Sequence, residues 1–177
     1  KVSLSDGELT GSEALLRWRH PERGMVPPNA FIGIAEDSGL IVEIGEWVLR
    51  EACRTASRWN GEGKPLHKVA INLSPRQFQG ADLAGMVFRA LEESACRPEW
   101  IELEITESLL LAEENEVLDV LNSFRAKGIS IAIDDFGTGY SALSYLARFP
   151  IATLKIDRSF ISSIATDTYR AELVKAI

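Results

Sequence analysis

Short apolar runs alternate along this chain with longer segments of helical periodicity. Val, Ile, Leu and Ala dominate four runs of strand length: Lys68–Leu73, Ile101–Thr106, Ile129–Asp134 and Thr153–Asp157. The third run is almost continuously apolar, as expected of a strand that is buried on both faces. Because strands that alternate with helices are joined by crossovers, the pattern predicts a parallel sheet flanked by helices.

Periodicity and capping residues locate the helices between these strands. Apolar residues recur at helical spacing over Glu43–Trp59, which predicts a long amphipathic helix. Asp82 is expected to cap a second helix, and Gly128 to end a third over Glu113–Lys127. The second helix should run to about Ala95, and shorter helices are expected at 28–36, after Ser74-Pro75, at 141–148 and from 167 to 177.

The first residues predict a hairpin that leads into a strand. Ser5-Asp6-Gly7-Glu8 has the composition of a tight turn, a strand is expected at 12–18, and a further turn at 20–24. The chain then holds about five strands that lead into helices, whereas a closed (β/α)8 barrel typically has about 250 residues. We therefore predict an α/β fold of the TIM-barrel type that is incomplete in this chain of 177 residues.

Polar residues interrupt the apolar strands at or near their C-terminal ends. They are Glu13, Asn72, Glu104, Asp134, Asp135, Lys155 and Asp157. In a parallel barrel these ends gather on one face, where active sites are built. Several carboxylates that converge in a low-dielectric cleft repel one another, so they must be protonated or bind cations.

Carboxylate and amide oxygens suit Mg²⁺ or Mn²⁺ better than zinc. The adjacent pair Asp134-Asp135 favours two metals, because one carboxylate could bridge ions about 3.5–4 Å apart, as in phosphoester hydrolysis. Lys155 could hold an attacking water or offset charge on a phosphoryl group. An enolase-type barrel with one metal and Lys155 as base stays open as an alternative.

Taken singly, each of these acids has an ordinary explanation as a solvated loop or helix-cap residue. Glu107 in particular could simply cap the helix that it precedes. Glu102 shares side-chain parity with Glu104 and should face the same way, but the sequence gives it no role. The recurrence of polar residues over five strands nevertheless favours one shared site.

Composition limits the partners and the compartment. The net charge is −7, with 26 acidic and 19 basic residues, which argues against a DNA-binding protein. An acidic site can still bind phosphate through intervening divalent cations. The two cysteines, Cys53 and Cys96, are expected to be buried thiols. They suit the cytoplasm, and no signal peptide or apolar run of about 20 residues is found, although a parent protein could be membrane-tethered.

The motifs resemble those of a known family in order and spacing. They are Glu13-Ala14-Leu15-Leu16-Arg17-Trp18, Asn72-Leu73-Ser74-Pro75-Arg76-Gln77-Phe78, Glu104-Ile105-Thr106-Glu107-Ser108, Asp134-Asp135-Phe136-Gly137-Thr138-Gly139-Tyr140-Ser141 and Leu154-Lys155-Ile156-Asp157. Together with shorter matches they cover nearly the whole chain. The chain is thus similar to the EAL-domain family of cyclic-di-GMP phosphodiesterases.

The resemblance implies a modified TIM barrel that linearises cyclic-di-GMP to 5′-pGpG with Mg²⁺ or Mn²⁺. It also implies a role for each matching residue. Glu13, Asn72, Glu104 and Asp134 would hold the first metal; Asp134 would bridge to a second, bound also by Asp135; Lys155 would contact the nucleophilic water; Glu107 would brace the loop at 135–141; Arg17 would reach a substrate phosphate; and Asp157 would line the site.

The chain departs from the family pattern at both ends. The first strand, with its Gln-Pro segment, and the C-terminal strands, with a Glu-Gly-Val-Glu motif, are expected to be missing, and Gly33 replaces the usual Pro. Residues 1–177 are therefore expected to form a partial EAL domain that is weakly active or inactive alone. The parent protein is expected to carry N-terminal sensory or GGDEF-type domains, and a homodimer is compatible with the resemblance.

Two other interpretations compete with hydrolysis. A non-catalytic cyclic-di-GMP receptor or regulatory module would usually have lost ligands, whereas every ligand position within the covered region is filled. Asp135-Phe136-Gly137 also occurs in protein kinases. No glycine-rich loop on a strand and no His-Arg-Asp segment accompanies it in this sequence, so a kinase is not supported.

Overall fold

The computed structural model describes residues 1–61, 66–79, 82–112, 114–137 and 148–162. The helix predicted at 167–177 lies outside the described residues, as does nearly all of the one predicted at 141–148. Within the described ranges, no helix combines the length and the apolar character that are needed to cross a bilayer.

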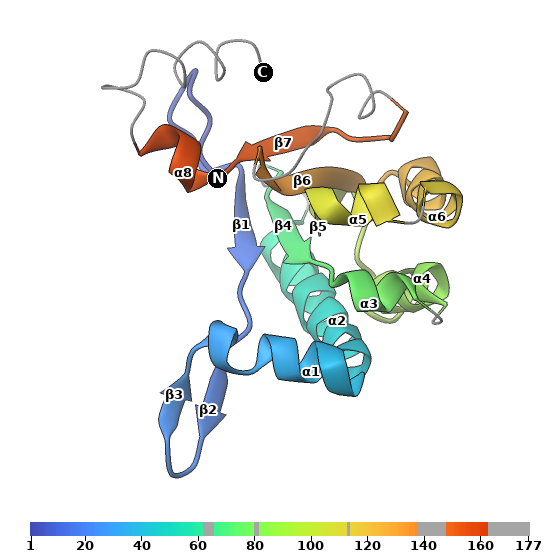
Figure 1. Ribbon diagram of the computed structural model, residues 1–177. Helices are drawn as coiled ribbons and strands as arrows, with labels where there is room; N and C mark the ends of the chain where they lie inside the picture. Colours follow the sequence, from blue (N-terminus) through green and yellow to red (C-terminus); the bar gives the residue numbers. More distant parts are fainter. Residues whose placement is uncertain (62–65, 80–81, 113, 138–147, 163–177) are drawn as a thin grey trace.

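Five parallel strands form one sheet in the order β1-β4-β5-β6-β7. Their bounds are β1 Gly11–Ala14, β4 Lys68–Asn72, β5 Ile101–Thr106, β6 Ser130–Phe136 and β7 Thr153–Ile156. The sheet curls, and β1 and β7 lie at its two edges (Figure 1). A small antiparallel ribbon of β2 Trp18–His20 and β3 Gly24–Val26 projects away from it.

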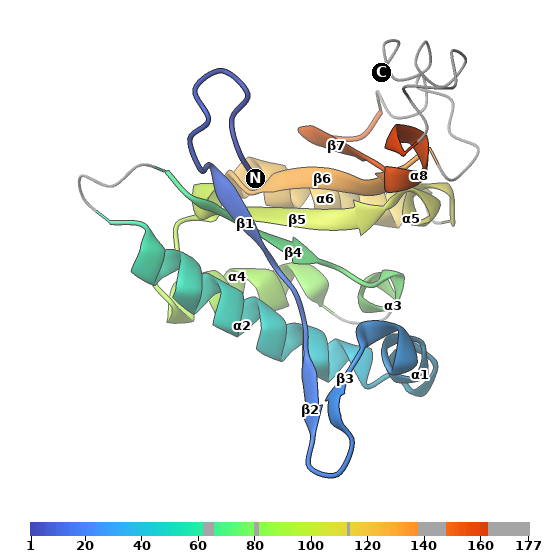
Figure 2. The same cartoon turned by 90° about the vertical axis from the view of Figure 1, so that its left-hand side faces the viewer.

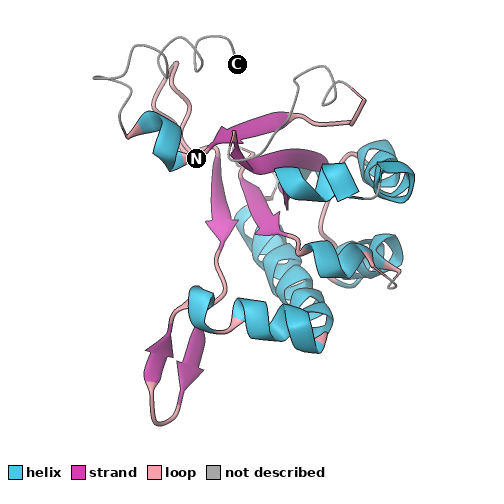
Figure 3. Ribbon diagram, viewed as in Figure 1, coloured by secondary structure: helices cyan, strands magenta, loops and turns pink. Residues whose placement is uncertain are grey.

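Three helices cover the outer side of the sheet: α2 Ile41–Trp59, α4 Leu83–Glu93 and α6 Glu114–Lys127 (Figures 2 and 3). The remaining described helices are shorter. They are η1 Pro28–Ala30, α1 Ile32–Ser38, α3 Pro75–Phe78, η2 Pro98–Trp100, α5 Glu107–Ala112 and α8 Arg158–Ile161. This curled parallel sheet with helices outside is an incomplete α/β barrel, as predicted.

The hydrophobic core lies between the sheet and these helices. Ile71, Leu103 and Ile131 point outward from β4, β5 and β6, are almost fully buried, and belong to one apolar cluster with Leu49 of α2 and Leu121 of α6. Cys53 and Cys96 are buried in the same cluster, as predicted. Burial of this outer face supplies the main driving force for folding.

The opposite, concave face of the sheet is polar. Because strand side chains alternate, residues two positions apart share this face. The strand register aligns Glu102 with Ser130, and Asn72 with Glu104, across neighbouring strands. A TIM-barrel interior is usually filled by branched apolar residues. Within the strand predicted over 129–134, Ile131, Ala132 and Ile133 are buried, so both faces are covered at its centre, whereas Asp134 adds a polar group to the concave side.

Most boundaries of the predicted elements agree with the structure within two residues, but the short helices η2 and α8 were not predicted, and one predicted strand ends early. The strand expected at 12–18 ends at Ala14, and Trp18 instead pairs with Val26 in the separate ribbon. The pairing of β1 with β4 ends at Ala14, opposite Ile71, so residues 15–17 have no neighbouring strand to extend the sheet. The cap at Asp82 is confirmed, since its Oδ1 accepts a hydrogen bond from the Gly85 amide at 2.9 Å.

Two helices end in the same motif with different residues in the left-handed position. After α4, the amide of Ala95 donates to Glu92 O at 3.1 Å, and Ala95 has φ of 48°. After α6, the amide of Gly128 donates to Arg125 O at 2.9 Å, and Gly128 has φ of 91°. An L-residue with a side chain is strained in this conformation, whereas glycine is not.

We therefore expect Ala95→Gly to raise the free energy of unfolding by about 0.5–1 kcal/mol, because it relieves the left-handed strain. Gly128→Ala should lower the free energy of unfolding by about 1 kcal/mol. Urea denaturation of both variants measures the two effects, and their opposite signs provide the control. An Ala95→Gly protein that is less stable than the wild type would contradict this account.

Candidate functional site

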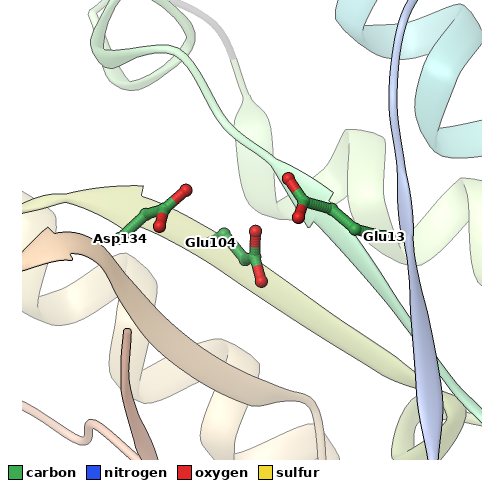
Figure 4. Close-up of side chains that lie close together, drawn as sticks. All are labelled: Glu13, Glu104 and Asp134. Atoms are coloured by element: carbon green, nitrogen blue, oxygen red, sulfur yellow. The ribbon is translucent and has the colours of Figure 1, made fainter. Parts of the chain in front are cut away.

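Three carboxylates from three strands meet on the concave face near the C-terminal ends of the strands. Glu13 of β1, Glu104 of β5 and Asp134 of β6 each offer one oxygen, and these oxygens lie within 4.8 Å of one another. Figure 4 shows the three side chains projecting from separate strands into one space. Glu104 is only 1% exposed, so its charge needs a partner.

The ammonium group of Lys155, on β7, joins this cluster. Its Nζ donates to Glu104 Oε2 at 2.6 Å and lies 3.1 Å from Asp134 Oδ2 and 3.5 Å from Glu13 Oε2. Burial disfavours the charged amine, but the hydrogen bonds that Lys155 donates to Glu104 and Asp134 outweigh it and raise the pKa of Lys155 above its ordinary value. Lys155 is therefore charged, and it offsets part of the repulsion between the carboxylates.

Asn72, at the end of β4, completes a set drawn from all five strands. Its Nδ2 donates to Glu13 Oε1 at 2.8 Å, which orients the carboxylate of Glu13. The donor set of three carboxylates and one amide is entirely oxygen. Such a set fits a hard divalent cation of the Mg²⁺ or Mn²⁺ kind, and three carboxylates in one small space require positive charge.

Asp135 has an unusual backbone conformation, with φ of 52°. The pairing of β6 with β7 shifts register between Ile133 and Phe136, which is how the strand accommodates it. Partial burial and then the neighbouring charge of Asp134 raise the pKa of Asp135 above its ordinary value. Among the described residues the cluster of three carboxylates does not include Asp135, so its predicted metal-binding role stays a prediction.

Glu107 contacts the backbone just after β6, and its predicted role in supporting the loop at 135–141 stays a prediction. Its side chain is buried, at 3% exposure, and Oε2 accepts a hydrogen bond from the Gly137 amide at 3.0 Å. Glu107 is also the first residue of α5. The sequence alone is compatible with a simple helix cap at Glu107. The hydrogen bond from the Gly137 amide shows that the carboxylate also contacts the residue that follows β6.

Arg17 and Asp157 lie outside the carboxylate cluster. Arg17 follows β1, donates through Nη1 to Leu16 O at 2.8 Å, and lines a hollow of about 400 Å³ together with Glu13 and Trp47. Asp157 caps α8, where hydrogen bonds from Ser159 lower the pKa of its carboxyl group. Their predicted contacts with substrate remain predictions.

Sequence reasoning gave no role to a second charged pair on the concave face. Glu102 is 4% exposed and forms an ion pair with the ammonium of Lys1. Thr153 also donates to Glu102 Oε2 at 3.2 Å. The parity of Glu102 with Glu104 was the available signal, but Lys1 lies a hundred residues away in sequence, and no local pattern connects the two.

Fold and site together define an α/β-barrel protein whose rim gathers carboxylates suited to a divalent cation. The family model for the EAL domain matches residues 1–177, and the chain belongs to the EAL-domain family.

Several relatives in this family are named for cyclic-di-GMP turnover. The bifunctional diguanylate cyclase/cyclic di-GMP phosphodiesterase MucR of Pseudomonas aeruginosa is 46% identical over 177 residues, covering 100% of this chain and 26% of MucR. The cyclic di-GMP phosphodiesterase PdeR of Escherichia coli is 42% identical over 171 residues, covering 97% of this chain and 26% of PdeR. The chain thus spans about a quarter of the length of these relatives.

Solved structures agree on the fold. The PaMucR phosphodiesterase in its c-di-GMP complex superposes with a TM-score of 0.92 at 46% identity, over 99% of this chain and 71% of that one. The EAL domain of FimX from Pseudomonas aeruginosa, bound to c-di-GMP, gives a TM-score of 0.87 at 23% identity, over 99% of this chain and 69% of that one. The predicted barrel of the EAL type, incomplete in this chain, is confirmed.

The carboxylate cluster generates a prediction about stability. Lys155→Met should lower the free energy of unfolding by about 1–3 kcal/mol in EDTA, because it leaves buried carboxylates without their cation. Added Mn²⁺ should then raise the melting temperature of this variant more than that of the wild type. Thermal melts with EDTA and with Mn²⁺ measure both effects, and Lys127→Met, which removes a lysine at the end of α6, is the control. An equal gain from Mn²⁺ in all three proteins would refute the prediction.

Proposed function

We propose that this chain supplies the metal-binding half of a phosphodiesterase that hydrolyses cyclic-di-GMP to 5′-pGpG with Mg²⁺ or Mn²⁺. The observation that carries the proposal is the meeting of Glu13, Glu104 and Asp134 at one rim. The names of MucR and PdeR support the substrate. A phosphodiester is an anion, and an acidic rim accepts it only when divalent cations lie between them.

The cation ligands follow from the donor set and the family resemblance. Glu13, Asn72, Glu104 and Asp134 would hold the first cation, and Asp134 would share a second with Asp135. Bound cations would supply charge compensation for the phosphodiester and would lower the pKa of water so that it can attack. Binding of two cations at this rim would require the carboxylates of both Asp134 and Asp135.

The other side chains have roles that do not depend on ligating a metal. Lys155 would donate a hydrogen bond to the attacking water and offset negative charge as it accumulates on the phosphoryl oxygens. Arg17 would bind a substrate phosphate, since a guanidinium matches two phosphate oxygens. Asp157 would line the site, and Glu107 would hold the loop that begins at Gly137.

We further infer that residues 1–177 are part of a larger EAL domain and have weak or no activity alone. The solved PaMucR chain extends beyond the region that this chain covers, which supports this view. A parent protein with sensory or GGDEF-type domains is in keeping with the bifunctional name of MucR. A cytoplasmic location is part of the same proposal. A homodimer stays a proposal of the same kind.

Hydrolysis of cyclic-di-GMP by the full-length protein with Mn²⁺ tests the proposed function directly. We expect 5′-pGpG to accumulate, and we expect Glu13→Ala to reduce kcat at least a hundredfold while leaving the circular dichroism spectrum unchanged, because it removes a ligand from the edge of the sheet. Binding of cyclic-di-GMP without any turnover in the wild type would establish the receptor alternative. Near-normal turnover in Glu13→Ala would contradict the metal assignment.

Asp134→Asn should damage turnover at least as much as Glu13→Ala. The substitution preserves the size of the side chain but removes the charge that is proposed to bridge two cations, and it also removes a carboxylate from Lys155. Single-turnover assays over a range of Mn²⁺ concentrations measure the loss. Full recovery of the rate at high Mn²⁺ would show that Asp134 contributes affinity only and does not bridge.

A further inference from the structure

A buried glutamate on β5 takes no part in the proposed reaction. Glu102 lies two residues before Glu104, so both side chains project from the same face of the strand. The two side chains are 6% and 0% exposed. Two neighbouring carboxylates at this depth repel each other and lose hydration, so a cation beside them stabilises the pair.

The ammonium group of Lys1 is that cation. It forms an ion pair with Glu102 Oε1, and it also lies 3.2 Å from Glu104 Oε1. Thr153 holds the other oxygen of Glu102 at 3.2 Å. Lys1 therefore connects a carboxylate that has no proposed catalytic role with one that is a proposed metal ligand.

The main chain fixes Lys1 in this place. The carbonyl oxygen of Lys1 accepts a hydrogen bond from the Thr10 amide at 3.0 Å, and Val2 pairs with Leu9 in an isolated antiparallel bridge. The first residues thus run back along the segment that leads into β1. Because β1 also carries Glu13, one short hairpin sets the positions of both Lys1 and a proposed ligand.

The two oxygens of Glu104 consequently have different partners. Oε1 is held by Lys1 at 3.2 Å, and Oε2 by Lys155 at 2.6 Å. Only Oε2 shares Lys155 with Glu13 and Asp134. The carboxylate is clamped in one orientation, with one oxygen toward the hairpin and the other toward the rim.

Charge balance on the concave face is consistent with a cation at the rim. The ion-paired network itself, which leaves out Lys68, joins the carboxylates of Glu13, Glu102, Glu104 and Asp134 to the side-chain ammonium groups of Lys1 and Lys155, and four negative against two positive charges leave a formal charge of −2. One divalent ion neutralises that charge. Lys1 and Glu102 cancel each other in this count, so their contribution is the orientation of Glu104.

We propose that Lys1 and Glu102 are a positioning pair: Lys1, seated on Glu102, holds Oε1 of Glu104 so that Oε2 faces the cation site. The proposal rests on the proposed function, because it assigns Glu104 to a metal. Residues that orient metal ligands typically contribute 10–100-fold to metal affinity. Lys1 touches neither substrate nor cation and acts through Glu104.

The test measures Mn²⁺ affinity of the full-length protein by titration calorimetry, separately from turnover. Lys1→Met should weaken Mn²⁺ binding about tenfold, since Glu104 loses its clamp. Lys1→Arg, which keeps the charge, should restore most of the affinity. If Lys1 were only a nearby positive charge, its removal would instead tighten Mn²⁺ binding, so tighter or unchanged binding in Lys1→Met overturns the proposal.

Glu102→Gln provides an independent variant if Lys1→Met folds poorly. This substitution removes the charge that pairs with Lys1 but keeps the shape of the side chain, and it should also weaken Mn²⁺ binding. The double variant should bind Mn²⁺ no more weakly than the worse single variant, because the two residues act as a unit. Additive losses in the double variant would contradict a joint role.

Lys68→Met is the matched control. Lys68 lies on the same concave face, but its Nζ donates to Ser130 Oγ at 2.6 Å, and Ser130 is not a proposed ligand. Its removal should leave Mn²⁺ affinity unchanged, and a loss of affinity equal to that of Lys1→Met would overturn the proposal.

The outcomes for the positioning pair and for the proposed function can be told apart. If the wild type binds Mn²⁺ but does not hydrolyse cyclic-di-GMP, the proposed function is wrong, whereas the pair is still supported if Lys1→Met binds Mn²⁺ more weakly than the wild type. A wild type that binds no Mn²⁺ overturns both.

Discussion

Repulsion between carboxylates in a confined, poorly hydrated space is the constraint on which this structure depends. Glu104 and its neighbours on the concave face need nearby positive charge, because at an effective dielectric constant of about 20 two like charges 4 Å apart repel by roughly 4 kcal/mol. Lys155 and Lys1 supply part of that charge. The remaining charge is negative, and it makes the concave face a place for a cation. A purely apolar interior would fold as well but would bind none.

The two faces of the sheet have different roles: the outer face forms the hydrophobic core, and the concave face carries the candidate site. Ile71, Leu103 and Ile131 face the helices and are buried in the apolar cluster, while residues one position along the strands face the concave side. The alternation of strand side chains makes this division possible without any special backbone. The exception is the end of β6, where a register shift and the left-handed Asp135 allow consecutive acids near one rim. Strain of this kind motivates the prediction that Asp135 serves the site.

The sequence predicted those features that local patterns encode. The strand Ile101–Thr106 and the cap at Asp82 were predicted correctly, since apolar runs and capping residues act within a few positions. The meeting of Glu13, Glu104 and Asp134 followed from one topological argument, that parallel strands end on a common face. The prediction that the first strand reaches Trp18 was wrong. The end of this strand depends on where its pairing with β4 stops, which no local pattern shows. The partner of Glu102 is equally non-local, and no periodicity in the sequence identifies it.

The network on the concave face also determines how its residues can be understood. Lys155 contacts three carboxylates at once, and Glu104 contacts two lysines. Removing any one group changes the charge and orientation of the rest, so the effects of single substitutions are not additive. A loss of activity on substitution therefore shows that a residue belongs to the network, but it does not show whether that residue binds the cation or orients a ligand. Ligands and positioning residues both act on the cation, the first by donating an oxygen to it and the second, as proposed for Lys1, through the carboxylate that they contact. Metal affinity measured apart from turnover therefore separates the residues that bind or orient a cation from the residues that act only on the substrate.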